Sequence, residues 1–408
     1  MLLKKCISCL LLASGTAVVA SSAAQHASAA LIGIARYFGP QDAARPLDAQ
    51  LGIEYHTVLI VFDGSKASVQ ATLPDVIVPH GQDWWRVGVK FDCQVESARD
   101  FTGDDREKGD IHKWSERLYS SRIEQAPQVL PSRFDPGSGT CSDQTIADFK
   151  RAIDSRQTAQ FSDWEPFQPC IYSAVAITGV TPDFVSTREH DGNSSECETT
   201  GFSWNDAAST RRIDDPKPVQ YSELFGYEGW EEYNRTLVAA GKDLAAHGMN
   251  CELSEDDLNS EDPRDTHDTG WYLQRRKGKW GAMAMLQLGN AVCQYESPLP
   301  RVLPAELVGY DRLRPGWAAL SRQLEGLEDA FTSPSGDLAV AVYPTQIETY
   351  ALQGQRADNQ LLALPGDRVV MVQWAEGKYV DAWERELKFW QRRGLPTPVV
   401  NPNLTEDQ

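Results

Sequence analysis

The chain is predicted to fold as an α+β protein built mainly from antiparallel β-hairpins and sheets, with about three substantial amphipathic helices. Short apolar or alternating runs recur along the sequence, and Gly, Pro and Asp turns separate them, as expected for strands joined by hairpins. Helical spacing of large apolar residues occurs in only a few places and not after every strand. This order disfavours a doubly wound parallel sheet.

The C-terminal region has the clearest pattern. Residues 338–343, 346–352 and 368–374 read as three strands of one sheet, with a polar loop before the third. A helix that ends at Gly394 is predicted to cover this sheet. The large residues expected on its buried face are Tyr379, Val380, Trp383, Leu387 and Trp390.

The N-terminal half is predicted to begin with two strand pairs. Residues 55–62 and 67–73 flank an Asp63-Gly64 turn, and residues 76–78 are expected to pair with 84–93. Residues 98–168 are polar and are expected to form long loops, with one short helix near 145–154 and a flexible Gly-Ser-Gly segment at 137–139.

The middle of the chain alternates between strands and helices. Strands are predicted at 170–180 and 183–188 and around Phe202, a helix at 222–247, and a hairpin at 271–275 and 280–288. The polar stretches 189–200 and 252–268 are expected to be solvated loops. A further amphipathic helix is predicted from the spacing of Trp317, Leu320, Leu324, Leu327 and Phe331.

Residues 1–29 are predicted to be a signal peptide. Lys4 and Lys5 precede an apolar segment at 10–19, and Ala27-Ser28-Ala29 forms an A-x-A cleavage site. A membrane anchor is the alternative, but Ser, Gly, Gln and His dilute the apolar run. We therefore expect a periplasmic or secreted protein with no membrane span after cleavage.

Net charge limits the class of partner. The formal charge is −19, and loss of Lys4 and Lys5 with the leader changes it to −21. Because this charge would repel a phosphate backbone, nucleic acid and anionic membranes are not expected as partners. The acidic surface serves solubility or attracts a basic protein.

Cysteine usage agrees with export. An even number of widely spaced cysteines follows the leader, and none of them forms a CxxC motif, so we expect up to three disulfides of undefined pairing. The candidate cysteines are Cys93, Cys141, Cys170, Cys197, Cys251 and Cys293.

Length and pattern suggest two domains. After the leader, residues 30–168 are predicted to form a β-rich domain with long loops, and residues 169–394 a C-terminal α+β domain. Residues 395–408 are expected to be a flexible tail.

No motif predicts a catalytic or cofactor-binding site, and no cofactor is expected. Asp268-Thr-Gly270 has the letters of an aspartic protease loop, but no apolar strand precedes it and no second copy exists, so a turn before a hairpin is the simpler interpretation. Neither a Gly-x-Ser-x-Gly elbow nor a His-Glu-x-x-His motif occurs.

The metal content is left open. Zinc would require His190-Asp191 and His267-Asp268 to converge from two polar loops. Calcium would use the oxygen-rich loop at 256–262, which lacks the spacing of an EF-hand and also fits a solvated acidic loop.

Residues 184–313 resemble the exported domain of lysozyme-sensing anti-sigma factors and related envelope proteins. The similarity consists of a strand pair at 185–189, the segment Phe202-Ser-Trp-Asn-Asp206 and a Tyr221-Ser-Glu-Leu-Phe225 step into a helix. A hairpin at 271–288 and the segment Leu303-Pro-Ala-Glu-Leu307 follow in the same order. Because the leader is predicted to be cleaved, the resemblance implies a protein-binding envelope domain without the membrane span of such a regulator.

Two functions follow as hypotheses. The first is an exported module that binds a protein or a cell-envelope component and is not an enzyme. The alternative is a secreted glycan hydrolase that uses two carboxylates. The many acidic residues are candidates for these carboxylates, and the twelve tryptophans are candidates for aromatic platforms that bind sugar rings.

Overall fold

The computed structural model describes residues 28–37, 53–96, 111–129, 139–140, 171–193, 203–246, 268–287, 294–354, 356–366 and 368–400. Its helices are α2 (Tyr221–Ala246), α4 (Ala305–Val308), α5 (Trp317–Gln323) and α6 (Lys378–Arg393). Its strands in the first half of the chain are β1 (Ser28–Tyr37), β2 (Ile53–Phe62), β3 (Ala67–Pro74), β4 (Val76–His80), β5 (Asp83–Glu96), β6 (Ile111–Arg122), β7 (Gln128–Val129), β8 (Gly139–Thr140), β9 (Ile171–Val180) and β10 (Phe184–Asn193). Those in the second half are β11 (Ser203–Arg212), β12 (Trp271–Arg276), β13 (Lys279–Gln287), β14 (Gln294–Leu299), β15 (Asp329–Thr332), β16 (Leu338–Val342), β17 (Gln346–Gln353), β18 (Arg356–Pro365), β19 (Arg368–Glu376) and β20 (Val399–Val400).

Antiparallel sheets dominate, which confirms the prediction of an α+β protein built mainly from antiparallel sheets. The two largest arrangements are a four-stranded sheet β19-β1-β2-β3 and a seven-stranded sheet whose main path is β11-β10-β9-β6-β5-β4. Smaller sheets follow the orders β12-β13-β14 and β15-β16-β17-β18. Among the described strands, parallel pairing occurs between β6 and β9 and between β7 and β20.

Strand β1 lies in the middle of a β-sandwich. It pairs with β19 on one side and β2 on the other, and both of its faces are buried. Ala30, Ile32 and Ile34 face a core shared with Leu338 and Val340 of the β15–β18 sheet. Burial on both faces explains why the run Ala29–Ala35 is continuously apolar instead of alternating.

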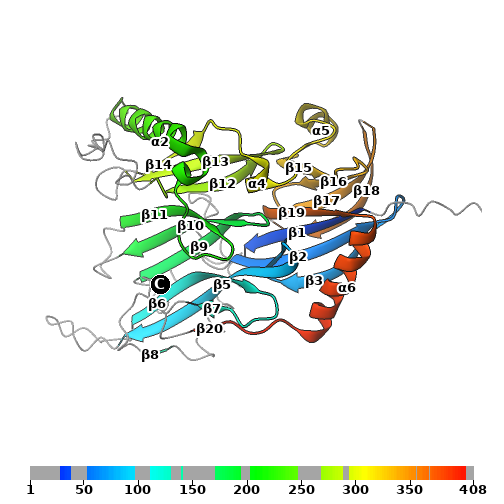
Figure 1. The fold of residues 1–408 in the computed structure, drawn as a ribbon, viewed down its shortest axis with the longest axis horizontal. Helices are drawn as coiled ribbons and strands as arrows, with labels where there is room; N and C mark the ends of the chain where they lie inside the picture. The colour runs from blue at the N-terminus through cyan, green and yellow to red at the C-terminus, as the bar shows by residue number, and fades with distance from the viewer. Residues whose placement is uncertain are drawn as a thin grey trace, which may run out of the picture.

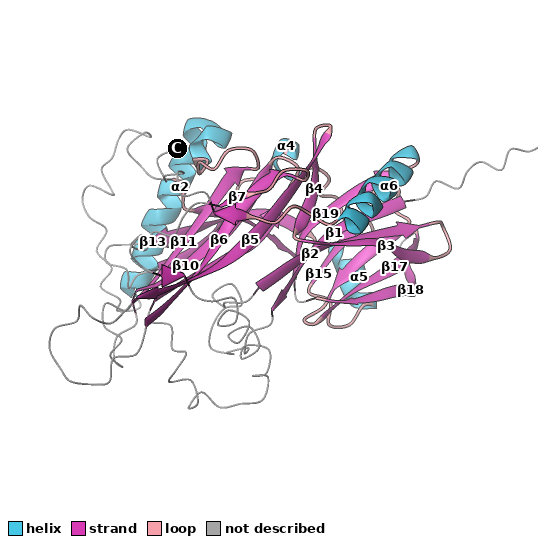
Figure 2. Ribbon diagram, turned by 90° about the horizontal axis from the view of Figure 1, so that it is seen from below, coloured by secondary structure: helices cyan, strands magenta, loops and turns pink. Residues whose placement is uncertain are grey.

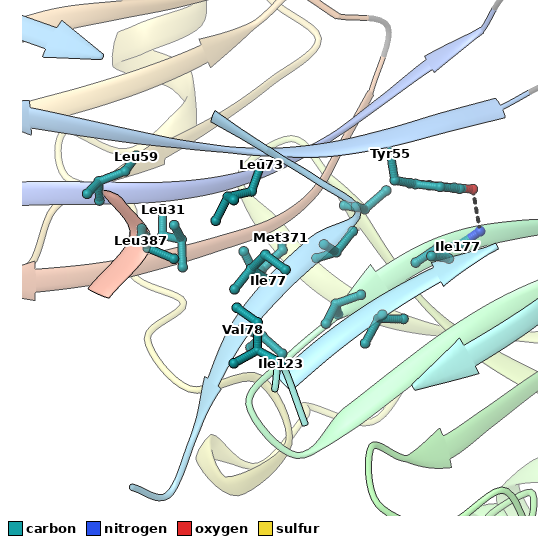
Figure 3. Close-up of a cluster of buried hydrophobic side chains, with 14 of the residues drawn as sticks. Leu31, Tyr55, Leu59, Leu73, Ile77, Val78, Ile123, Ile177, Met371 and Leu387 are labelled. Carbon is teal, nitrogen blue, oxygen red and sulfur yellow. Dashed lines mark hydrogen bonds between the residues drawn. The ribbon is translucent and has the colours of Figure 1, made fainter. Parts of the chain in front are cut away.

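Helix α6 covers the opposite face of the β19-β1-β2-β3 sheet, and it runs beside β3 (Figure 1). Leu387 and Trp390 of this helix join Leu31 and Leu59 in a core that extends to β4, β5 and β9 (Figure 3). The Ile177 backbone N–H donates to Tyr55 Oη at 2.8 Å across this core. The sandwich and the seven-stranded sheet therefore share one apolar interior.

The β12–β14 sheet packs against the β9–β11 end of the seven-stranded sheet, and α2 packs on β13 and β14 (Figures 1 and 2). Their common core contains Trp271 and Leu273 from β12, Tyr221 and Tyr233 from α2, and Leu307 from α4. Segments that are far apart in the sequence thus meet around the start of α2.

The prediction that residues 338–343, 346–352 and 368–374 form strands of one sheet is wrong. Strands β16 and β17 belong to the outer sheet, whereas β19 lies in the other sheet of the sandwich and pairs with β1. The polar loop expected before β19 is instead the ten-residue strand β18, the hairpin partner of β17. Its Leu361, Leu362 and Leu364 are only half-buried, so neighbouring polar residues concealed the strand pattern.

Strand β6 was missed because polar residues occupy its buried positions. The prediction of long loops across residues 98–168 is wrong for 111–122, which form the partner of β5. Glu116 and Ser121 are buried, which breaks the apolar alternation. Gly139 also lies in a strand, while the helix expected near residues 145–154 lies outside the described residues.

The helix predicted from Trp317 to Phe331 is much shorter than expected. Helix α5 ends after Gln323, Leu324 is extended, and Gly326 has a positive φ of 77°. Phe331 then pairs with Val340 in β15–β16, so tertiary strand pairing overrides the helical spacing. The described residues therefore contain two long helices, α2 and α6, and two short ones.

Helix α6 follows its prediction except at its first turn. Val380, Leu387 and Trp390 are buried, and the Gly394 N–H donates to the Trp390 carbonyl at 2.9 Å. Tyr379 is 59% exposed, so it does not belong to the buried face.

Two sheets combine strands from both sides of residue 168, because β1 pairs with β19 and β6 pairs with β9. Strand β1 begins at Ser28, so its first two residues lie within the segment expected as a leader. None of the helices in the described residues has the length and apolar character needed to cross a membrane.

A buried arginine joins the β12–β13 hairpin to the outer sheet of the sandwich. Arg275, whose side chain is 5% exposed, forms ion pairs with Asp311 and, at 3.2 Å, with Asp329. It donates to the Ala330 carbonyl at 2.7 Å and lies 3.9 Å from the Phe331 ring centroid. Burial raises the pKa of Asp329, although Arg275 opposes this shift.

A second buried arginine joins β5 to the C-terminal segment. Arg86 Nε lies 2.5 Å from Asp75 Oδ2, and the guanidinium also donates to the Pro396 carbonyl and to Tyr119 Oη. Tyr119 Oη donates to the same Asp75 oxygen at 2.8 Å. A Cβ at Gly88 would lie 2.5 Å from both Asp75 and Tyr119, so this strand position has no room for a side chain.

Candidate functional site

Most of the sequence-predicted site residues lie outside the described structure. Cys93 is placed only by its backbone in β5, opposite Trp114, and the other five candidate cysteines fall outside the described residues. The oxygen-rich loop at 256–262 and His267 also fall outside them. His190 and Asp191 belong to strand β10 and not to a loop, because the β10–β11 pairing continues to Asn193.

Asp268 is fully buried, which corrects its placement in a solvated loop. Its Oδ2 accepts a 2.7 Å hydrogen bond from the Ser222 N–H, and its carbonyl accepts one of 2.9 Å from the Tyr221 N–H. These N–H groups belong to the first turn of α2, where they have no partner within the helix. Asp268 is therefore a cap supplied from a distant part of the chain, and Asp268-Thr-Gly270 forms the turn before β12, as predicted.

Replacement of Asp268 should separate its capping role from its charge. We expect Asp268→Ala to lower the free energy of unfolding by about 1–2 kcal/mol, because the Ser222 N–H loses its acceptor. Asp268→Asn keeps an oxygen acceptor and should cost less. Burial raises the pKa of Asp268, so stability from the neutral carboxyl is present at low pH and is lost as pH rises through the folded-state pKa.

Urea unfolding at about pH 4 and about pH 7 tests this prediction. Asp268→Asn should gain stability relative to the wild type as pH rises, because the amide does not ionise. Equal losses for both variants at both pH values would show that the carboxyl group does not act through its charge.

Helix α2 contains a break at Gly226, which has φ 66° and ψ −162°. The Tyr221–Phe225 segment therefore forms a separate first turn, and the longer helical part starts at Tyr227. A positive φ favours glycine, since other residues are strained there. Tyr227 therefore follows directly after a bend in the chain, and the Tyr227 side chain is 60% exposed.

A buried hydrogen-bond network underlies this bend. Tyr221 Oη donates to Glu232 Oε1 at 2.9 Å, and Arg301 Nε donates to Glu232 Oε2 at 3.2 Å. Burial, assisted by the bond to Glu232, raises the pKa of Tyr221, so its hydroxyl remains a donor. Because Glu232 is itself buried, these bonds fix the position of Arg301.

Arg301 connects the network to the surface. Its Nη1 lies 3.3 Å from Glu228 Oε2, whose side chain is 79% exposed, and its guanidinium lies 5.8 Å from the Phe225 ring centroid. The next residue, Val302, is 89% exposed. Tyr227 and Val302 are the chain neighbours of Glu228 and Arg301, which this ion pair joins, and we call Tyr227, Glu228, Arg301 and Val302 the Tyr227 surface.

The chemical character of the Tyr227 surface suits recognition. Tyrosine and arginine are enriched among the residues that dominate protein interfaces. The Tyr227 ring lies 5.2 Å from the Trp230 ring, and Trp230 is buried, so the aromatic side chain rests on a rigid base. An arginine held in place before binding loses less conformational freedom on association.

The buried carboxylates of Asp75, Asp268 and Asp329 are engaged by other groups of the protein. Burial raises the pKa of Asp75, Asp268 and Asp329, but each of these groups is bound to an arginine or to backbone N–H groups. Glu228 and Glu232 are likewise both bound by Arg301. Within the described residues, no group of three or more His, Cys, Asp or Glu side chains is arranged to bind a metal ion.

The chain matches no protein-family model, and no curated protein sequence matches it.

Sequence reasoning located the helix but not the surface beside it. The Tyr221–Phe225 step and the hairpin at 271–288 were recognised, whereas Arg301 and Val302 were not singled out. One available signal was the Pro300-Arg-Val-Leu-Pro304 segment, in which two prolines enclose one basic and two apolar residues. The contact between Arg301 and Glu232 joins residues far apart in the sequence, and no local pattern predicts it.

Proposed function

We propose that the protein is an exported, disulfide-bonded binding module that recognises a protein or cell-envelope component through the Tyr227 surface. The observation that carries this proposal is the exposure of Tyr227 and Val302 beside an arginine fixed by buried Glu232. The predicted leader and the cysteine parity support export. These features fit a periplasmic or secreted location.

A relation to the exported domain of lysozyme-sensing anti-sigma factors is part of the same proposal. The strands and helices on which the resemblance rests form neighbouring elements, namely β10, β11, α2, the β12–β13 hairpin and α4. The Tyr221–Phe225 step contributes directly to the network below the Tyr227 surface. The Tyr221–Phe225 step, on which the resemblance chiefly rests, is thus a neighbour of the proposed interface.

Substitution at the Tyr227 surface should weaken partner binding without unfolding the protein. We expect Tyr227→Ala and Val302→Ser each to reduce affinity by about tenfold, because each removes an exposed apolar anchor. The measurement is capture of partners from an envelope extract on the immobilised exported chain, followed by titration of the retained component. Attraction by the acidic surface predicts that retention falls at high salt.

Tyr379→Ala is the matched control, since Tyr379 is similarly exposed on α6. This variant should bind like the wild type. Equal retention by all three variants would exclude the Tyr227 surface as the interface. Shortening of glycans in the extract, with no component retained, would instead favour the hydrolase hypothesis.

A further inference from the structure

The start of β1 is bonded to two distant segments. Ser28, which is 1% exposed, donates from Oγ to Asp337 Oδ2 at 2.8 Å. The other oxygen of Asp337 accepts hydrogen bonds from Ser333 Oγ at 2.6 Å and from Ser335 Oγ at 2.7 Å. The Ser28 hydroxyl thus completes the set of donors around a carboxylate in the turn before β16.

The backbone of Ser28 and Ala29 is also paired with a strand on each side. Ser28 pairs with Phe62 of β2 and Glu376 of β19, and Ala29 pairs with Val61 and Ala375 of the same strands. Glu376 also accepts a 2.9 Å hydrogen bond from the Ser335 N–H, which connects the end of β19 to the turn. Ser28 and Ala29 are therefore part of the sandwich.

Cleavage after Ala29 would remove both residues from the folded protein. Asp337 Oδ2 would lose the Ser28 donor, and β2 and β19 would lose the two pairs formed by Ser28 and Ala29. Ala29 and Ala30 are fully buried, so the cut would also place a new amino group at a buried position. A cut at this bond conflicts with the structure even though Ala27-Ser28-Ala29 has the letters of a cleavage site.

We propose that the leader is removed before Ser28, by hydrolysis of the Ala24–Gln25 peptide bond. Ser22-Ala23-Ala24 places small residues at the two positions that a leader peptidase requires, close behind the apolar segment. The reaction consumes one water and leaves a carboxyl group on Ala24 and an amino group on Gln25. This assignment rests on the export proposed above, and it retains Ser28 and Ala29 in the mature chain.

The N-terminus of the exported protein tests this directly. The full chain is expressed in a host with a general secretion pathway, and the exported form is analysed by intact mass and N-terminal sequencing. An N-terminus at Gln25 is the expected result, and one at Ala30 would overturn the proposal while leaving export intact. A chain that keeps residues 1–24 and stays in the cytoplasm would contradict both the processing site and the proposed export.

A stability comparison tests the role of Ser28 independently of export. Chains that begin at residues 25, 28 and 30 are produced without the leader, and their melting temperatures are compared. The first two should melt together, whereas the chain that starts at Ala30 should melt lower by on the order of 3 °C, because it lacks the Ser28 and Ala29 interactions. Identical melting of all three chains would overturn the structural reason for the earlier cleavage site.

Discussion

Replacement of Arg275 by alanine is expected to lower the free energy of unfolding by about 3–5 kcal/mol, because two carboxylates then lose their buried cationic partner. The guanidinium binds Asp311 and Asp329 and lies against the Phe331 ring. Without it, two carboxylates are left close together, and Asp329 is largely buried. Burying an unpaired charge costs much more than losing a surface ion pair.

Chemical denaturation monitored by tryptophan fluorescence measures the effect. Arg276→Ala is the matched control, because Arg276 is the next residue of β12 and its side chain is exposed. We expect the control to change stability by less than about 0.5 kcal/mol. Equal stability of the two variants would contradict a structural role for the Arg275 cluster.

Replacement of Arg86 by alanine should produce a loss of similar size, about 3–5 kcal/mol. Arg86 pairs with Asp75, bonds Tyr119 and donates to the Pro396 carbonyl, so the substitution also frees the segment that follows α6. Asp75 would retain only the hydroxyl of Tyr119 as a side-chain partner among the described contacts.

The loss at Arg86 should depend on pH. Burial raises the pKa of Asp75, and the charge of Arg86 counteracts this shift. Removing Arg86 therefore raises the pKa further, so stability is present while the carboxyl is neutral and is lost as pH rises through its folded-state pKa. Unfolding curves should show a larger difference from the wild type at about pH 7 than at about pH 4.

Arg122→Ala serves as the control for Arg86. Arg122 pairs with Asp83 at 3.4 Å, but both side chains are nearly half exposed, so water screens the charges. For Arg122→Ala we expect only a small loss in the free energy of unfolding, and this loss should not change over the pH range in which Asp75 ionises. A loss for Arg86→Ala that did not change with pH would show that Asp75 does not respond to the missing charge.

Local patterns predicted much of the secondary structure. The Asp63-Gly64 turn, the alternation in β5 and the large residues of α6 identified these elements, because their geometry depends on neighbours in the sequence. The patterns failed where tertiary contacts decide the environment. Buried Glu116 in β6 accepts a hydrogen bond from the Val175 N–H, and this partner makes a polar residue acceptable inside the sheet.

The candidate site was less predictable than the fold. Asp268 looked like the end of an acidic loop, and only its contact with Ser222 reveals a cap. The Tyr227 surface depends on the bend at Gly226 and on the pairing of Arg301 with Glu232, which long-range packing creates. Sequence alone predicted the α2 helix but could not show which of its residues remain exposed.

The position of β1 between β2 and β19 determines when the sandwich can be completed. The ribosome makes β1 at the beginning and β19 near the end, although the two strands lie side by side. Until β19 appears, one edge of β1 has no partner, and the apolar residues of β1 lack part of their cover. The sandwich therefore closes only after nearly the whole polypeptide has been synthesised. Under the export proposed above, this delay would let the chain be threaded through a translocation channel before its core becomes stable.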